Sequence, residues 1–416
     1  MAIGGKLSPK PSSLHDPEKP VAFHRLAYRV EGDEVTVGRT DIDSYAVFPR
    51  DGAELVRKLA DGATPSEATR WYNATYGTTV DVADLLERLS AFGFLRDEEE
   101  SATTDRPIRW QRLGRAAFSP AAWAGYGLLL SAATVAMVRS PDLLPSYRNI
   151  FFTDYYTLIT VVIFVAQIPA VLVHEAFHAL AGRRLGLRSR LSVGRRFYFV
   201  VFETSLDGLV MVPRRKRYLP FLAGMLADLL FLAGFTLMAQ LGRNPDDSLP
   251  WHSRLFLALA FSTLLRLVWQ FYLYLQTDIY FLISTVLGCD DLHGAARALL
   301  RSRVDRLFGR AVNAPGSGFS VVDRRAARWY SWLLVAGYGF SIATLLLSVV
   351  PMFDHVLRGL YHRVSHSDHA NDVQLLDSAV FLLISVAQLA FAASLAWRAR
   401  RRRTHDSHIP SLEGVS

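Results

Sequence analysis

The segment HEAFH at positions 174–178 places two histidines and a glutamate in the spacing HExxH. On a helix, His174 and His178 lie on one face, where both can bind a single Zn²⁺ ion. Glu175 then lies beside the metal and can act as a general base toward a water molecule. The single cysteine, Cys289, excludes a multi-thiolate zinc site, so further ligands must be histidine or carboxylate.

The motif lies in an apolar stretch, Tyr156 to Leu180, that is long enough to cross a membrane. Ionisable side chains at membrane depth are costly unless they have partners or a function. A histidine pair that only supports helix packing is the alternative interpretation. The charged glutamate between the two histidines favours a membrane-embedded zinc hydrolase.

The composition is typical of a membrane protein with large aqueous parts, because 51% of residues are hydrophobic and 20% are charged. The first 20 residues lack an apolar core, so we expect no signal peptide there. We predict a mainly α fold: a polytopic membrane helix bundle of about six spans with an N-terminal α+β domain. The fourth span is too long for one straight crossing. The expected spans are residues 118–138, 156–182, 219–242, 254–288, 330–352 and 375–398.

Basic residues gather in alternate loops. Ten lie between the second and third spans, eight between the fourth and fifth, and five at and after the end of the sixth. By the positive-inside rule, this pattern predicts a multi-pass protein of a bacterial-type inner membrane with both termini in the cytosol. We attribute the net charge of +8 to this pattern and to contact with anionic membrane lipid, not to nucleic acid.

Three aspartates compete as the third metal ligand, because a catalytic zinc site usually has three protein ligands. Asp228 and Asp278 lie in expected spans, and Asp207 lies in the basic loop. His293 is weaker because it lies beyond the span. The loop segment 191–213 is apolar and β-branched, which predicts strand pieces or a re-entrant hairpin beside the site. A cytosolic hairpin without a role is the alternative.

The first hundred residues form a separate unit. Two strands near 28–30 and 34–37, a third at 44–48, and three short helices predict a winged-helix-like domain. Residues 51–100 hold five basic and eleven acidic side chains, a balance that argues against nucleic-acid binding. We expect a disordered N-terminus (1–24), this domain (25–97), a linker (98–117), the transmembrane domain (118–398) and a basic cytosolic tail (399–416).

Across residues 118–290, the chain resembles the site-2 protease group of intramembrane zinc metalloproteases. The features that carry this resemblance are HEAFH in a span, the basic loop, AGxxxD in the next span, and an aspartate followed by aromatic residues. Its bacterial peptide zinc metalloprotease branch is the most similar. The resemblance implies that Asp278 is the third ligand, although the Asn-Pro and Gly that flank the family aspartate are missing here.

The same resemblance implies roles for three further residues. Gly224 and Asp228 match a position near the substrate, so they are expected to orient the substrate or, for Asp228, to serve as an alternative ligand. Asp207 lies in an LDG sequence similar to another ligand motif of the group. The expected order of preference for the third ligand is Asp278, then Asp228, then Asp207.

Residues 25–97 resemble the PqqD-like domains, which bind leader peptides of ribosomally made, modified peptides. The resemblance implies that a peptide adds a strand to the hairpin edge and lays a helix on the third helix. The expected function is therefore a zinc metalloendopeptidase that removes the leader of such a precursor peptide. The alternatives are regulated intramembrane proteolysis of a transmembrane signalling substrate, and a peptide exporter or immunity protein with a vestigial metal site.

Overall fold

The computed structural model describes residues 16–96, 108–196, 199–289, 291–309, 319–344 and 372–406, with a few positions between 346 and 361. The chain divides into two compact units. The first comprises residues 1–109 with 185–190 and 206–213, and the second comprises the remaining residues. Residues 1–15, residues 98–107 of the expected linker, and the last ten residues of the expected tail lie outside the described residues.

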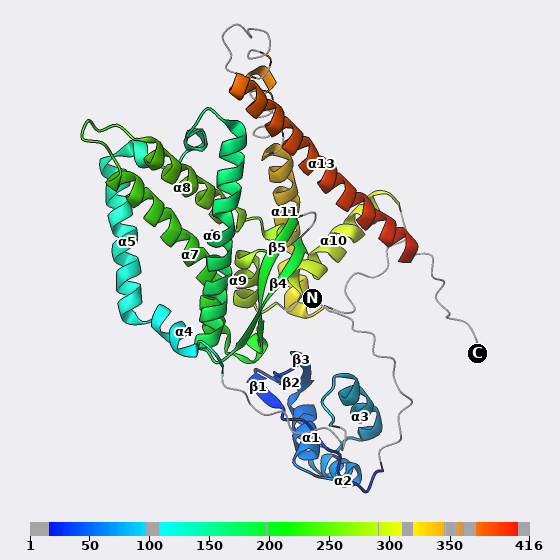
Figure 1. Cartoon of the computed structure of the whole chain (residues 1–416). Helices are drawn as coiled ribbons and strands as arrows, with labels where there is room; N and C mark the ends of the chain where they lie inside the picture. The colour runs from blue at the N-terminus through cyan, green and yellow to red at the C-terminus, as the bar shows by residue number, and fades with distance from the viewer. Residues whose placement is uncertain are drawn as a thin grey trace. The chain divides into compact units, whose positions relative to one another are not determined.

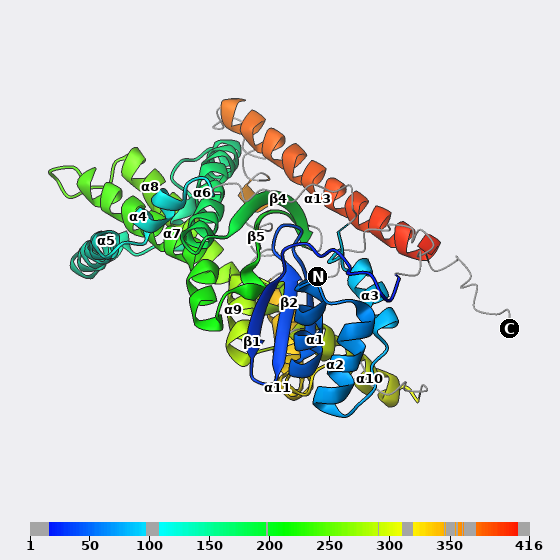
Figure 2. The same cartoon turned by 90° about the horizontal axis from the view of Figure 1, so that it is seen from below.

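The first unit contains an antiparallel sheet in the order β1-β2-β3, with helices α1 to α3 following it in sequence (Figures 1 and 2). Val35 and Val37 of β2 form a core with the apolar faces of the three helices. The strands and helices lie where the sequence predicts them, whereas the winged-helix arrangement stays a prediction. The elements are β1 (Ala27–Glu31), β2 (Glu34–Arg39), β3 (Ser44–Pro49), α1 (Arg50–Ala60), α2 (Pro65–Tyr76) and α3 (Val82–Ala91).

Local capping explains why α2 and α3 begin where they do. Thr64 and Glu67 form a complete capping box at the start of α2. The Asp81 side chain accepts hydrogen bonds from two backbone N–H groups of α3. These polar signals are local in sequence, so they can be recognised without the fold.

The chain already contacts this domain before residue 25, so the expectation of disorder fails for the described part of that segment, residues 16–24. Phe23 pairs with Leu95, and the backbone N–H of His24 donates to the carbonyl of Phe94. Val21 and Phe23 also pack against the core. Removing these apolar side chains from water is favourable, and this holds the segment against the domain.

The second unit is mainly helical (Figure 1). Its helices are α4 (Gln111–Ala117), α5 (Pro120–Arg139), α6 (Tyr156–Arg184), α7 (Arg214–Leu241), α8 (Trp251–Trp269), α9 (Asp278–Leu287), α10 (Leu292–Leu307), α11 (Val321–Thr344) and α13 (Asp372–Asp406). Short 3₁₀ turns are η1 (Pro141–Leu143), η2 (Tyr147–Ile150) and η4 (Leu273–Leu275), and η3 (Leu209–Met211) belongs to the first unit. The strands β4 (Arg188–Arg196) and β5 (Phe199–Asp207) belong mainly to this unit, whereas their residues 188–190 and 206–207 belong to the first unit.

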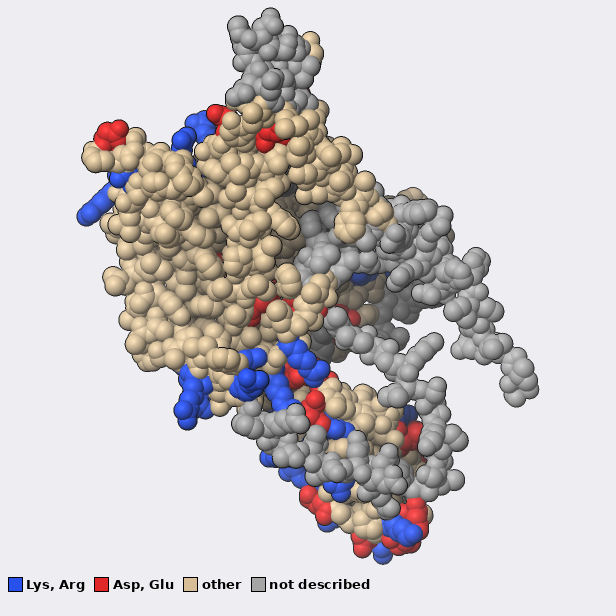
Figure 3. Space-filling model, viewed as in Figure 1, with Lys and Arg blue, Asp and Glu red and all other residues tan. Residues whose placement is uncertain are grey.

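Three helices, α5, α6 and α7, are long and apolar enough to cross a membrane. The side chains seen over these helices are almost all uncharged (Figure 3). The expected fourth span, 254–288, is broken into α8, η4 and α9. The expected spans 330–352 and 375–398 overlap α11 and α13, but residues 345 and 347–352 lie outside the described residues. The six-span count therefore stays a prediction.

Two expected boundaries change in this unit. The last part of the expected linker, 98–117, forms α4, which packs against α6. The helix α13 continues past residue 398 to Asp406, into the expected tail. The strands predicted within 191–213 do occur, as the antiparallel ribbon β4-β5, and the Thr204 hydroxyl donates to the backbone carbonyl of Glu175.

Helix α7 lies at the centre of the second unit, where it packs against α5, α6, α8 and α9. Its buried face is built from small residues, including Ala223, Gly224 and Ala227. Small side chains let helix backbones approach closely in an apolar environment. This close approach brings the HExxH face of α6 against α7.

Candidate metal centre

The HExxH motif occupies the second half of α6. His174, Glu175 and His178 are all buried, although they are among the most polar residues of an otherwise apolar helix. The two histidine rings lie on the same face, with centroids 4.8 Å apart. Their placement agrees with the sequence-based expectation of a shared ion.

Three side-chain atoms meet at one point in this unit. The Nε2 atoms of His174 and His178 are 3.1 Å apart, and Oδ2 of Asp278 lies 3.2 Å from the first and 3.1 Å from the second. These atoms belong to the one group among the described residues that could hold a metal ion. The near-equilateral triangle joins two residues of α6 with the first residue of α9.

The proton positions on both imidazoles follow from their other nitrogen. Nδ1 of His178 lies 2.6 Å from the carbonyl oxygen of Pro220, which can only accept, so Nδ1 carries the proton. Nδ1 of His174 lies 3.0 Å from Oδ2 of Asp228, a buried carboxylate that also accepts. In the neutral tautomers, both Nε2 atoms therefore present lone pairs to each other and to Asp278.

In these neutral tautomers the three lone pairs would repel one another, and a cation at their centre would remove that repulsion. A tetrahedral zinc ion with bonds of about 2.0–2.1 Å separates its ligand atoms by about 3.3–3.4 Å. The observed sides of 3.1–3.2 Å are close to one face of that tetrahedron. Two imidazole nitrogens and one carboxylate oxygen also form a donor set that zinc accepts.

Gly224 leaves space at the same point. A Cβ atom added to Gly224 would collide with Nε2 of both His174 and His178. The glycine of the AGxxxD pattern therefore matters because it has no side chain that would fill the space beside the two histidines. Asp228, one helical turn farther along α7, contacts Nδ1 of His174 and so orients the ring whose Nε2 belongs to the triangle.

Asp278 is positioned by a break in the apolar stretch between α8 and α9. Gln276 adopts φ +56°, a left-handed conformation that a glutamine rarely takes, and α9 begins two residues later. The side-chain oxygen of Gln270 accepts the backbone N–H of Asp278 at 3.2 Å. The break before Asp278 therefore forms without the Asn-Pro and Gly that the sequence lacks there.

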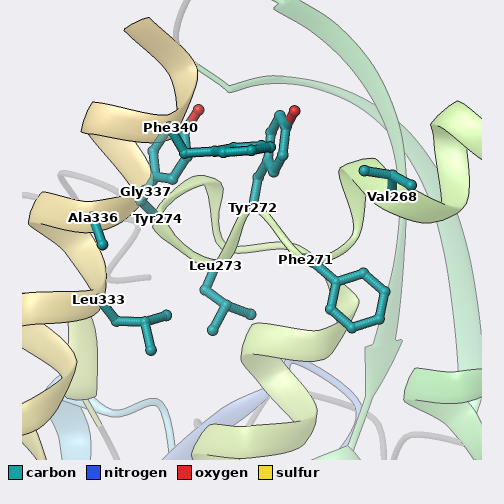
Figure 4. A pocket seen from close by; sticks show the side chains of 9 residues that line it. All are labelled: Val268, Phe271, Tyr272, Leu273, Tyr274, Leu333, Ala336, Gly337 and Phe340. Carbon is teal, nitrogen blue, oxygen red and sulfur yellow. The ribbon is translucent and has the colours of Figure 1, made fainter. Parts of the chain in front are cut away.

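Aromatic packing holds the irregular segment in place. An apolar pocket of about 340 Å³ lies between this segment and α11 (Figure 4). Tyr272 packs edge-on against Phe340, and Tyr274 packs against Tyr338 with ring centroids 4.8 Å apart. Non-helical backbone at membrane depth requires such burial in protein.

The other sequence candidates lie elsewhere. Asp207 is buried in the first unit, where it pairs with Arg190 at 2.9 Å, and it is not in the metal-binding group. His293 packs against Tyr280 and Tyr330, and burial lowers its pKa to about 4. Asp228 supports His174 instead of joining the triangle.

Sequence reasoning missed two residues that contact the site. Arg266 of α8 donates to Oδ1 of Asp228 from Nε at 2.9 Å and from Nη2 at 2.6 Å. Gln270, the C-cap residue of α8, follows one turn later and accepts the backbone N–H of Asp278. An arginine inside an apolar stretch was the available signal, because such a charge needs a partner.

No protein-family model matches the chain, and no curated protein or solved structure matches it either. The assignment of a function therefore depends on the geometry of the residues themselves.

We expect Asp278→Ala to lower metal occupancy more than Asp228→Ala or Asp207→Ala. The first change removes a corner of the triangle, the second removes a support of His174, and the third alters an ion pair of the first unit. Metal content of each purified variant, measured by mass spectrometry, checks the order. Full occupancy in the Asp278 variant with loss in either other variant would reverse it.

Proposed function

We propose that the chain is a zinc metalloendopeptidase of a bacterial-type inner membrane, with both termini in the cytosol. One observation carries this proposal: the Nε2 atoms of His174 and His178 and a carboxylate oxygen of Asp278 converge at one point, in a motif that also contains the buried Glu175. The motif ends five residues before Arg183, close to a cluster of basic residues that flanks α6 and α7. By the positive-inside rule, cleavage takes place near the cytosolic face.

His174, His178 and Asp278 would hold the zinc ion. When bound, zinc polarises a peptide carbonyl and lowers the pKa of water, which makes hydrolysis feasible at neutral pH. Glu175 takes the proton from water and passes it to the departing amine. Asp228 and the carbonyl of Pro220 keep the two imidazoles in the metal-binding tautomer throughout.

A precursor peptide with a leader is the proposed substrate, and the first unit supports this choice. A groove of about 300 Å³ runs between β1 and α1, lined by Tyr28, Val30 and Val35 with Arg50, Ala53, Glu54 and Arg57. β1 is an edge strand of its sheet, and an extended peptide can lengthen such an edge. The mixture of apolar and charged side chains fits a peptide segment of similar mixed character.

Regulated proteolysis of a transmembrane signalling protein uses the same chemistry and is the second candidate. A peptide exporter or immunity protein is less well supported, because a vestigial site has no need for Gly224, which leaves room for an ion between the histidines. Membrane lipid is the other expected partner, and nucleic acid is not expected.

A peptide library offered to the purified protein in detergent micelles tests the function. We expect zinc-dependent cleavage that stops when a chelator is added and returns with added zinc. The variant carrying both His174→Ala and His178→Ala should cleave nothing. A metal-loaded protein that cleaves no member of a library containing leader-type and transmembrane-type sequences would contradict the proposal.

Capture of the leader by the first unit gives a further expected result. Val30→Asp places a charge in the groove, so the concentration of precursor needed for half-maximal cleavage should rise at least about tenfold, with little change in kcat. The control is Val47→Asp on the opposite face of the same sheet, because Val47 is 57% exposed and Val30 is 62% exposed. Equal effects of both variants in steady-state kinetics would refute a substrate-binding groove.

A further inference from the structure

Helix α8 contributes no ligand, yet the side chains of its residue Arg266 and of its C-cap residue Gln270 hold residues of the metal centre. Arg266 bonds to Asp228, which orients His174, and Gln270 bonds to the backbone of Asp278. Arg266 and Gln270 are four residues apart and thus lie on the same face of α8. One helix face therefore contacts the supports of two ligands that come from different helices.

The two carboxylate oxygens of Asp228 have different partners. Oδ1 accepts two N–H groups of Arg266, and Oδ2 accepts the Nδ1–H group of His174. Arg266 also donates to the side-chain oxygen of Gln167 on α6. The guanidinium thus links α8 to α6 and α7 in a single network.

The charge of this network explains why arginine is needed. Asp228 is fully buried, and an isolated carboxylate at such a place is strongly unfavourable. The side chain of Arg266 is 15% exposed and neutralises it. Without the cation, the buried carboxylate would lack its charge partner and two of its hydrogen bonds, and His174 would lose its fixed orientation.

The contact with Asp278 acts on the backbone. Asp278 is the first residue of α9, and Thr277, which precedes it, makes no side-chain cap. Instead the Thr277 hydroxyl donates to the carbonyl of Gln270 at 2.5 Å, and the Gln270 side chain accepts the N–H of Asp278. Gln270 therefore fixes both residues at the start of α9, and with them the position of the carboxylate.

We propose that Arg266 and Gln270 are positioning residues that set the affinity and the ligand geometry of the metal centre. The inference rests on metal binding by His174, His178 and Asp278. It does not require that the protein be a peptidase, and its test reads metal binding alone.

The experiment loads the full-length protein with Zn²⁺ for affinity and with Co²⁺ for visible absorption, which reports ligand geometry. Arg266→Gln and Gln270→Leu should each weaken zinc binding by roughly 10- to 100-fold, which is the usual effect of removing a residue that orients a metal ligand. Both variants should also shift the cobalt bands. Matched controls are Arg243→Gln, which removes an 11% exposed arginine paired with Asp142, and Gln240→Leu on α7.

A second-site change separates positioning from packing. If Arg266 acts by balancing the charge of Asp228, the double variant Arg266→Gln with Asp228→Asn should recover much of the affinity lost in Arg266→Gln. If the double variant instead loses as much affinity as the two single variants together, the proposal is overturned. It is also overturned if the Arg266 and Gln270 variants show the zinc affinity and cobalt spectrum of the Arg243 control. Should Arg266→Gln alone fail to fold, the double variant still decides, because a folded protein with near-native affinity supports charge balance and an unfolded one refutes it.

Discussion

Gly224→Ala is expected to remove the metal while leaving the helices intact. The added methyl group would occupy the space between the Nε2 atoms of His174 and His178. Alanine favours a helix over glycine by about 1 kcal/mol, so loss of helix propensity cannot explain a defect. Metal content should fall to background while circular dichroism remains unchanged.

Gly234 supplies the control for this substitution. It lies on the same helix, and a Cβ atom there would meet no other atom within 4 Å. Gly234→Ala should therefore keep full metal content. Normal occupancy in the Gly224 variant would mean that the ion does not lie between the two histidines.

The second large effect concerns Glu175. We expect Glu175→Gln to retain zinc and to lose peptidase activity by about 10²–10⁴-fold, the usual contribution of a general base. The amide keeps the size of the side chain but cannot take up a proton. Cleavage rates with a precursor peptide, together with zinc analysis of the same sample, provide the measurement.

Glu203→Gln on β5 removes a carboxylate from the neighbouring hairpin and serves as the matched control. Its rate should stay near that of the unchanged protein. A Glu175 variant that cleaves as fast as this control would show that the proton passes through another group.

The sequence was sufficient to predict features that depend on nearby residues. HExxH placed His174 and His178 on one helix face, and the capping residues Thr64 and Asp81 marked two helix starts. The resemblance to a protease group also selected Asp278 ahead of Asp228. Each of these inferences uses a periodicity or a short motif that survives without tertiary context.

The sequence was insufficient where a contact joins distant segments. Asp228 and Arg266 lie 38 residues apart, and only the fold shows that they share a bond. The helix break before Asp278 also carries no local signal, because no Pro or Gly lies between Gln270 and Asp278 and the break depends on the left-handed backbone of Gln276. Hydropathy alone treats 254–288 as one apolar stretch, because it does not report hydrogen bonds such as those made by Gln270.

The carbonyl of Pro220 has a consequence for the order of events in a newly made chain. Because this oxygen can only accept, the tautomer of His178 is chosen as soon as α6 and α7 pack, before any ion arrives. Small zinc domains commonly stay unfolded until the metal binds, since their ligands have no other partner. Here folding itself prepares the ligands, so the apoprotein should mature as a stable species and acquire its ion as a late step.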